Sequence, residues 1–310
     1  MLRSHTLAGK DDGGPCVSDV VTRRHLLMLV ALAAIWGSSF MSIEIALREL
    51  SPATLILLRL AFGAAALGAF VPLSGSSFRQ LRPYAGRLAL MGAFNTAVPF
   101  FLIAWGQLYI PSGLAAIFNA SAPLFTAVFA LSVDRTQQVR GLRLVGLVLG
   151  FAGIVALVGF ETGGGSRAVA GSLAVVAAAV LYALGALFAG RHLAGAPPVL
   201  VSFGSLAWAT LFALPLGAAE ATRFGWATLA AMLFLGVGAT AVAYLLYFGL
   251  IAGAGASRAI LVTYLVPSLA LVYGALFLDE AVTVPALVGL ALVLGGVALG
   301  TRRPRVASAG

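Results

Sequence analysis

Ten continuous apolar stretches, each close to 20 residues long, constrain this sequence of 310 residues more than any other feature. An α-helix needs about 20 apolar residues to cross the hydrocarbon core of a bilayer. A membrane β-barrel would instead show strands of about ten residues with alternating polarity. The sequence therefore predicts an all-α membrane protein with ten transmembrane helices. They are expected near 26–47, 52–73, 86–108, 112–133, 141–160, 168–190, 197–218, 226–250, 256–278 and 283–300.

The composition excludes a water-soluble domain. Hydrophobic residues make up 61% of the chain and charged residues only 9%, whereas soluble proteins carry about 25% charged residues. The net charge of +9 does not indicate a nucleic-acid partner, because the arginines stand in short gaps between apolar stretches and do not gather with aromatic residues on a solvated face. The single cysteine, Cys16, cannot form a disulfide within the chain.

The positions of the basic residues predict how the chain is oriented. Cytoplasmic loops of membrane proteins carry an excess of Lys and Arg. If the stretches cross the membrane in turn, 15 of the 19 basic residues fall on the side that also holds both ends of the chain. Arg48, Arg167 and Arg223 fall on the opposite side, and Arg59 lies within a stretch. We therefore expect a multi-pass protein of the plasma (inner) membrane with both termini in the cytoplasm.

The two halves of the chain resemble each other at a nearly constant offset. One run matches at an offset of 144 residues, placing Gly92, Thr96, Ala97 and Val98 on Gly236, Thr240, Ala241 and Val242. An offset of 146 residues places Pro52 on Pro198. Each half holds five stretches, an odd number, so the halves must lie inverted in the bilayer, as in many secondary transporters. We expect tails over 1–24 and 302–310, a first five-helix repeat over 25–160 and a second over 161–301.

Two groups of motifs stand at the beginning and the end of the apolar region. The first reads Trp36-Gly37-Ser38-Ser39-Phe40, followed by Leu58-Arg59-Leu60, and the second reads Val266-Pro267, followed by Leu278-Asp279-Glu280. Over roughly residues 26–300 the chain resembles EamA-type members of the drug/metabolite transporter superfamily. The resemblance implies a ten-helix carrier, often an exporter, with a cavity lined by the first, third, fourth, sixth, eighth and ninth spans. Glu44 departs from the family, whose members often have lysine there.

Two charged residues are expected inside the membrane, Glu44 and Arg59. A charge at that depth costs about 2.5–3.5 kcal/mol on insertion scales, so such residues mark either a function or a neutralising pair. Both are expected toward the same membrane face, where they could meet as a structural ion pair. Alternatively, Glu44 binds a substrate ammonium or takes up a proton during transport. In a third alternative, the side chains reach the membrane surface.

A second group of candidates consists of polar and aromatic residues within the stretches. Those expected to line a substrate cavity are Trp36, Asn95, Asn119, Tyr182, Tyr244 and Tyr264. A polar group in the membrane needs a hydrogen-bond partner, which is either the substrate or a neighbouring helix, and aromatic residues also form belts at the membrane interface. Proline frees backbone carbonyls and permits a hinge. The hinge candidates are Pro99, Pro123 and Pro267.

An intramembrane enzyme is the main competing class, and it would need a nucleophile, a base or a metal within the spans. The histidines His5, His25 and His192 lie in the tail or at the ends of stretches, so we predict no catalytic residue, no metal and no cofactor. A scaffold or signalling subunit is the other alternative, and it predicts no substrate flux. The expected function is secondary transport by alternating access. Export of amino acids or other small metabolites or drugs is preferred to import. Its partners are a small-molecule substrate and membrane lipid, and coupling to protons stays open.

Overall fold

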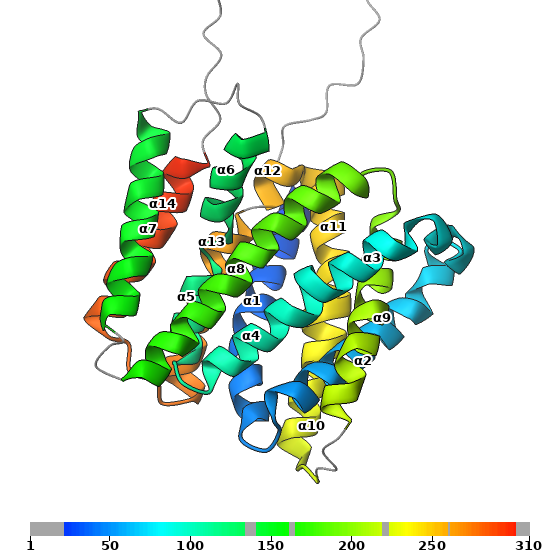
Figure 1. Cartoon of the computed structure of the whole chain (residues 1–310), viewed down its shortest axis with the longest axis horizontal. Helices are drawn as coiled ribbons and strands as arrows, with labels where there is room; N and C mark the ends of the chain where they lie inside the picture. The colour runs from blue at the N-terminus through cyan, green and yellow to red at the C-terminus, as the bar shows by residue number, and fades with distance from the viewer. Residues whose placement is uncertain (1–21, 134–140, 161–164, 219–222, 260, 302–310) are drawn as a thin grey trace, which may run out of the picture.

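The computed structural model describes residues 22–133, 141–160, 165–218, 223–259 and 261–301, and the regular structure in these ranges is entirely helical. The helices pack side by side in one bundle (Figure 1). The all-α class predicted from the sequence is therefore confirmed for the described part of the chain. The predicted tails lie outside these ranges, apart from residues 22–24.

In the described ranges, the first half of the chain contains seven α-helices, one π-helix and one 3-10 helix. In chain order they are α1 (Arg23–Leu47), α2 (Pro52–Leu73), the 3-10 helix η1 (Phe78–Tyr84), α3 (Ala85–Gly92), the π-helix η2 (Ala93–Ala97), α4 (Val98–Gln107), α5 (Ser112–Asn119), α6 (Ala122–Val133) and α7 (Leu142–Phe160). The elements from η1 to α4 form one continuous segment, whereas α5 and α6 are separated by a break.

The second half follows a similar order. Its elements are α8 (Ser166–His192), α9 (Pro198–Gly217), α10 (Trp226–Leu233), the π-helix η4 (Phe234–Val242), α11 (Ala243–Ala254), α12 (Ala256–Ala259), α13 (Val262–Phe277) and α14 (Val284–Gly300). The elements α10, η4 and α11 again form one continuous segment with a π-helix in its middle.

Hydroxyl side chains and prolines set several helix starts. Before α2, Ser51 Oγ accepts a hydrogen bond from the Thr54 amide at 3.3 Å, and Pro52 occupies the first position of the helix. Before α14, Thr283 Oγ1 accepts from the Ala286 amide at 3.3 Å. These hydroxyls satisfy amides that have no partner within the helix, and proline in the first turn sacrifices no hydrogen bond.

Eight helical segments in the described ranges are long and apolar enough to cross a membrane. They are Arg23–Leu47, Pro52–Leu73, Phe78–Gln107, Ser112–Ala130, Leu142–Phe160, Ser166–His192, Pro198–Gly217 and Trp226–Ala254. Two shorter apolar helices, α13 with 16 residues and α14 with 17, occupy the last two predicted stretches. The third segment begins at Phe78, before the predicted residue 86, because Ser77 and Gln80 form a capping box that starts η1.

The most extensive packing joins the first half of the chain to the second. Helix α7 packs along α14, α2 along α9 and α1 along α13, while α8 packs on α4 and α6. Figure 1 shows α7 and α14 together at one edge of the bundle, and α2, α3 and α9 at the other. Each half therefore completes its packing only in contact with the other half.

Glycines allow the backbones of α7 and α14 to touch. A Cβ atom placed at Gly296 would overlap the backbone of Gly150 and lie 2.7 Å from the Gly146 carbonyl oxygen. A Cβ atom at Gly153 would lie 2.8 Å from Leu292 Cβ. Small residues at such crossings let membrane helices approach closely. This edge of the bundle is therefore held by backbone-to-backbone packing.

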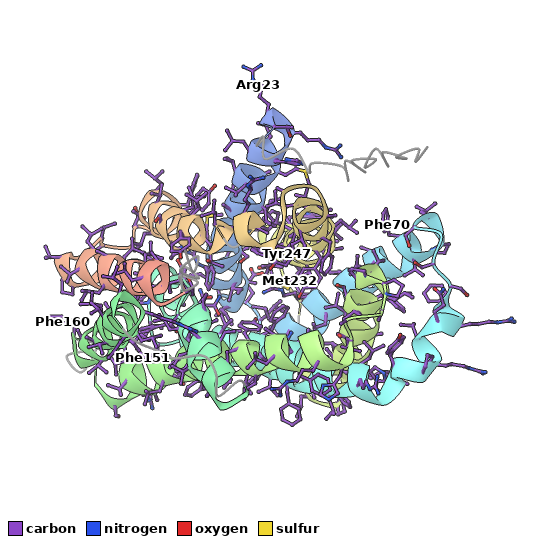
Figure 2. All side chains as sticks on the ribbon, turned by 90° about the horizontal axis from the view of Figure 1, so that it is seen from above. Arg23, Phe70, Phe151, Phe160, Met232 and Tyr247 are labelled. Carbon is purple, nitrogen blue, oxygen red and sulfur yellow. The ribbon has the colours of Figure 1, made fainter. Side chains whose placement is uncertain are left out.

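The interior is a large apolar cluster to which both halves contribute, and much of the outer surface is apolar as well. Leu60 of α2 and Leu206 of α9 are fully buried in this cluster. In the view from above, Met232 lies inside the bundle and Phe160 lies at its edge (Figure 2), and their side chains are 0% and 60% exposed. An apolar outer surface of this extent is what contact with lipid requires.

Candidate functional site

Arg59 lies buried on α2, between the two halves of the bundle. Its side chain is 7% exposed, and its Nε donates a hydrogen bond to Thr240 Oγ1 at 3.3 Å. Its guanidinium carbon lies 4.0 Å from the centre of the Phe100 ring, which is a cation–π contact. Phe100 belongs to α4 and Thr240 to η4, so Arg59 contacts both halves of the chain.

The π-helical geometry of η4 holds Thr240 in place beside Arg59. The Thr240 hydroxyl donates to the Leu235 carbonyl, five residues earlier, at 2.8 Å, and its oxygen accepts from Arg59 Nε. The offset of 144 residues places the whole of η2 within η4. π-Helical segments are rare and are frequent at functional sites. Both halves therefore carry this unusual geometry at matching positions.

The same matching identifies the counterpart of Arg59 in the second half. A Cβ atom at Gly236 would lie 2.9 Å from the Arg59 carbonyl oxygen, and one at the matching Gly92 would lie 2.7 Å from the Ser205 carbonyl oxygen. Arg59 and Ser205 differ by 146 residues, the offset that also relates the prolines at the starts of α2 and α9. The equivalent position thus carries a short hydroxyl side chain. The positive charge of the site comes from the first half alone.

Aromatic residues from three helices surround Arg59. Tyr182 of α8 and Tyr244 of α11 lie within electrostatic range of the guanidinium. Trp36 of α1 donates from Nε1 to the Ala239 carbonyl at 3.1 Å, and Ala239 directly precedes the threonine that binds Arg59. Two candidates from the sequence, Tyr182 and Tyr244, therefore lie within electrostatic range of the buried charge, and a third, Trp36, binds the backbone beside its partner Thr240.

The remaining cavity candidates, Asn95, Asn119 and Tyr264, have other contacts in the structure. Asn95 packs against Gly185 of α8, where a Cβ atom would overlap the asparagine amide. The amide oxygen of Asn119 is enclosed and has no hydrogen-bond partner within the described ranges. Tyr264 packs on the apolar core. The structure does not join these three side chains to Arg59 by a hydrogen bond.

The predicted hinge prolines occupy different local structures. Pro99 stands in the first turn of α4, directly after η2. Pro123 stands in the first turn of α6, after the break that follows Asn119. Pro267 lies inside the continuous helix α13. Two of the three prolines therefore mark places where the helix geometry changes, and the third does not.

The structure does not bring Glu44 and Arg59 together. Glu44 is half-buried near the end of α1, and its Oε2 is enclosed without a hydrogen-bond partner in the described part of the chain. The charges within electrostatic range of this carboxylate are those of Glu280 and Arg48. Glu44 therefore interacts with loop residues at the helix end, whereas Arg59 contacts α4 and η4. The structural ion pair considered from the sequence is not formed.

Glu280, which sequence reasoning did not assign, joins the halves at a helix N-terminus. Its carboxylate accepts hydrogen bonds from the Ser112 amide at 2.8 Å and the Gly113 amide at 3.2 Å, at the start of α5. An anion at this position is stabilised by the unpaired amides and by the helix dipole. A neighbouring pocket has a volume of about 80 Å³, below the roughly 300–1,000 Å³ of small-molecule sites.

Glu49 makes an equivalent contact between the loop after α1 and the start of α10. It accepts hydrogen bonds from the Gly225 amide at 2.8 Å and the Thr228 hydroxyl at 2.6 Å. The contacts of Glu49 and Glu280 are referred to below as the acidic ties. Their sequence signal is an acidic residue directly after an apolar stretch, but the bonded partners lie 167 to 179 residues away. Local pattern alone therefore cannot identify them.

Two arginines form the corresponding contacts at helix C-termini. Arg87 Nη1 donates to the His192 carbonyl at 3.1 Å, at the end of α8. Arg143 Nε donates to the Gly300 carbonyl at 3.2 Å, at the end of α14. A cation is favourable there because the last carbonyls of a helix are unpaired and carry the negative end of the dipole. These contacts, the basic ties, also join the first half to the second.

Gln107 is a buried amide that sequence reasoning missed. Its side chain is 3% exposed, and its Nε2 donates to the Phe40 carbonyl at 2.9 Å, which joins α4 to α1. Its Oε1 is enclosed without a partner in the described ranges. In the same part of the chain, no group of three or more His, Cys, Asp or Glu is arranged to hold a metal ion.

Protonation of Glu49 is expected to weaken its tie. Hydrogen bonds from the Thr228 hydroxyl and the Gly225 amide hold the pKa of this carboxyl below its usual value. A group whose pKa is lowered by folding stabilises the folded protein above its unfolded pKa, about 4.3 for glutamate, and this contribution is lost as the pH falls through the folded pKa. We therefore expect Glu49→Gln to melt below the wild type at pH 7, and the two melting temperatures to converge below about pH 4.

Thermal unfolding in detergent at stepwise pH values measures this effect. Thr228→Val, which removes the hydroxyl donor, should lower the melting temperature in the same pH range. A gap between wild type and Glu49→Gln that stays constant down to pH 3 would contradict the assignment.

Comparison with known proteins gives matches over most of the chain. A family model described as the EamA-like transporter family matches residues 23–159 and again residues 169–302. The chain is 30% identical over 288 residues to a probable terminal-alkyne amino-acid exporter of Streptantibioticus cattleyicolor. This match covers 89% of this chain and 92% of the relative. It is 26% identical over 281 residues to the uncharacterized transporter YvbV of Bacillus subtilis, covering 89% and 91%.

A shorter match joins the chain to the uncharacterized inner membrane transporter YedA of Escherichia coli, with 31% identity over 165 residues, covering 53% and 52%. A solved crystal structure matches with a TM-score of 0.65 at 20% identity, over 90% of this chain and 97% of the other, which shows a shared fold. The family matches fall on both halves of the helical bundle. The chain is therefore a multi-pass membrane transporter that belongs to the EamA-like transporter family.

Proposed function

We propose that this protein is a secondary transporter that exports an amino acid, or another small metabolite or drug, by alternating access. The observation that carries the proposal is the site around Arg59, in which a residue of the first half is bonded to a residue of the second. Similar halves that share a central site are the common architecture of secondary transporters. The exporter relative supports amino acids as the first substrate class to test.

The membrane arrangement that belongs to this function has ten spans in two inverted five-helix repeats, over 25–160 and 161–301. Two matches to one family model support the repeat, and so does the paired packing of α1 on α13 and of α8 on α6. Helix α1 begins and α14 ends toward the upper side of Figure 1, which supports placing both termini on one side of the membrane, and the excess of basic residues on that side favours the cytoplasm. In this orientation the acidic ties lie at the outer face and the basic ties at the cytoplasmic face.

Alternating access requires the two faces of the bundle to open in turn. The ties of Glu49, Glu280 and Arg87 each bond a charged residue of one half to a helix terminus of the other half, so rocking of the halves separates these charges from the helix termini. Opening of the outer face breaks the bonds of Glu49 and Glu280, and opening of the cytoplasmic face breaks the bond of Arg87. Helices α7 and α14, whose backbones are in contact, move together as one rigid unit at the edge of the bundle.

Glu44 is the group we propose for coupling to protons. Its Oε2 has no donor within the described ranges, and its charge lies within electrostatic range of Glu280, which forms an acidic tie. Addition of a proton to Glu44 removes the repulsion between the two carboxylates. The protonation state of Glu44 is thereby linked to the contact that closes the outer face.

Flux into proteoliposomes tests the transport function. The purified protein is reconstituted, and the uptake of L-leucine and of L-propargylglycine, a terminal-alkyne amino acid, is measured with and without a pH gradient. We expect saturable flux above that of empty liposomes and a stimulation by the gradient. Glu44→Gln should lose the stimulation and keep the flux measured without a gradient. Asp279→Asn, which removes an exposed carboxylate nearby, is the matched control and should behave as the wild type.

The outcomes separate the competing functions. The absence of saturable flux for all standard amino acids would contradict amino-acid transport and favour a scaffold or signalling subunit. If the flux of the wild type is the same with and without the pH gradient, the protein is a facilitator and Glu44 has no role in proton coupling.

A further inference from the structure

Most of the hydrogen-bonding capacity of Arg59 is unused within the protein. A guanidinium carries five N–H donors, and the Nε–H donates to Thr240. No hydrogen bond or ion pair joins Nη1 or Nη2 to a described residue, and neither atom is among the fully enclosed polar atoms, although the side chain as a whole is only 7% exposed. A buried cation is costly unless it is paired with an anion or fully hydrogen-bonded. Four N–H groups of Arg59 are therefore available to a partner other than the described residues.

The chain supplies no counter-ion for Arg59 within the membrane. Of its ten acidic residues, Glu44 is the one inside an apolar stretch, and it faces Glu280 and Arg48. Glu49 and Glu280 are bonded at helix N-termini. The other seven acidic residues stand in the tails or between stretches. No acidic side chain therefore pairs with Arg59 in the described part of the chain, and an anion from outside the chain would supply the missing charge.

The surroundings of Arg59 fit a carboxylate. The Phe100 ring lies 4.0 Å from the guanidinium carbon, and no described residue uses the donors on Nη1 and Nη2. A planar carboxylate accepts two parallel hydrogen bonds from such a fork, which a lysine ammonium cannot provide. Tyr182 and Tyr244 lie within electrostatic range of the guanidinium, and a phenol hydroxyl can donate a hydrogen bond to an anion.

An aromatic wall adjoins this polar centre. The rings of Trp36 and Tyr247 lie 5.5 Å apart, and the indole is bonded to Ala239, next to the threonine partner of Arg59. Figure 2 shows Tyr247 near the middle of the bundle. A wall of this kind favours contact with an apolar group, because aromatic rings bury large apolar areas.

We infer that Arg59, assisted by Tyr182 and Tyr244, binds the carboxylate of the transported substrate. The substrate is then an organic acid or a zwitterionic amino acid with an apolar side chain that packs on Trp36. This inference rests on the transport function proposed above and names its substrate class. The competing role is a structural arginine held by Phe100 and Thr240 alone.

Probes that share one carbon chain distinguish these roles. L-propargylglycine carries both an ammonium and a carboxylate. Pent-4-ynoate lacks the ammonium, and but-3-yn-1-amine lacks the carboxylate. L-propargylglycine amide carries an uncharged carboxamide in place of the carboxylate. Each unlabelled compound competes with the flux of labelled L-propargylglycine into proteoliposomes. We expect both carboxylates to compete, and the amine and the amide to require at least about tenfold higher concentrations, since a bond to a charged group is lost.

Variants of the site locate the interaction. Arg59→Lys keeps the charge and loses the fork, and should raise KM for L-propargylglycine about tenfold while kcat stays within a factor of two. Arg59→Leu should lower kcat/KM about 100-fold, and Tyr244→Phe should raise KM about fivefold. Arg79→Leu, which removes an exposed arginine of η1, is the matched control and should leave both constants unchanged.

A binding measurement, the shift of the melting temperature by a ligand, tests the inference without requiring flux. Sodium pent-4-ynoate should raise the melting temperature of the wild type above that in equal sodium chloride, and should not do so for Arg59→Lys. This shift without any flux would reject the transport function and retain the carboxylate site. Equal competition by the acid and its amide, or an equal shift in wild type and Arg59→Lys, would overturn the role of Arg59 even if flux is present.

Discussion

A Gly296→Leu variant is expected to melt about 5–10 °C below the wild type. A Cβ atom at this position would overlap the Gly150 backbone and lie 2.7 Å from the Gly146 carbonyl oxygen. Backbone cannot yield as a flexible side chain does, so α7 and α14 must separate along their length. Such overpacking costs about 3 kcal/mol. Thermal unfolding of the detergent-purified protein, followed by size-exclusion chromatography, measures the effect.

The neighbouring glycine provides a matched control for this prediction. A Cβ atom at Gly295 would meet no atom within 4 Å, so Gly295→Leu adds the same volume where space is open. Glycine also disfavours a helix by about 1 kcal/mol relative to good helix formers, and Gly295→Leu should therefore melt at or slightly above the wild type. Equal destabilisation by the two variants would show that the backbones of α7 and α14 do not meet at Gly296.

Removal of the Glu280 tie is expected to open the face of the bundle that it closes. In Glu280→Gln one carboxylate oxygen and the charge are lost, and the amides of Ser112 and Gly113 lose a charged partner. The expected cost is about 2 kcal/mol, roughly a 30-fold shift toward the conformation in which the tie is broken. Because transport needs both faces to close in turn, L-propargylglycine flux should fall about tenfold or more.

Cysteine labelling measures this opening directly. Leu114 is 7% exposed, lies in the first turn of α5 and borders the pocket beside Glu280. In a Cys16→Ser, Leu114→Cys background, a membrane-impermeant maleimide added to intact cells should label Leu114→Cys about tenfold faster when Glu280→Gln is also present.

Two results would contradict this account of the Glu280 tie. Asp279 is exposed and carries a positive φ of 56°, which asparagine also tolerates, so Asp279→Asn removes a neighbouring charge without breaking the tie. If Asp279→Asn accelerates the labelling of Leu114→Cys as much as Glu280→Gln does, the effect comes from the loss of negative charge in the loop and not from the broken tie. Acceleration only in inside-out vesicles would place the tie at the cytoplasmic face.

The helical framework could be predicted because each apolar stretch carries its own signal. A run of 20 apolar residues marks a span without reference to the rest of the chain, and the described α-helices and π-helices fall largely on the predicted stretches, whereas the 3-10 helix η1 precedes the stretch predicted at 86–108. The match of Gly92 and Thr96 to Gly236 and Thr240 also predicts the positions at which η2 and η4 correspond. The exclusion of charge from the bilayer was sufficient to single out Arg59, although its role as a substrate ligand stays a proposal.

The contacts between distant residues could not be predicted in the same way. Glu44 and Arg59 stand near one end of neighbouring stretches, yet they do not pair, because the rotation of each helix is set by packing against the second half. The acidic ties depend on partners more than 160 residues away. The π-helices arise from one extra residue per turn in a continuous apolar run, and hydropathy does not register such a change.

The matching π-helices also bear on the history of the gene. Both halves match one family model, and each carries a π-helix at the same place relative to that match. Two independent insertions at one position are less economical than a single insertion in an ancestral half-length protein, before duplication and fusion. Arg59 and Ser205 occupy equivalent places and differ. This comparison favours a helix distortion that preceded a duplication, and a difference in charge between Arg59 and Ser205 that followed it.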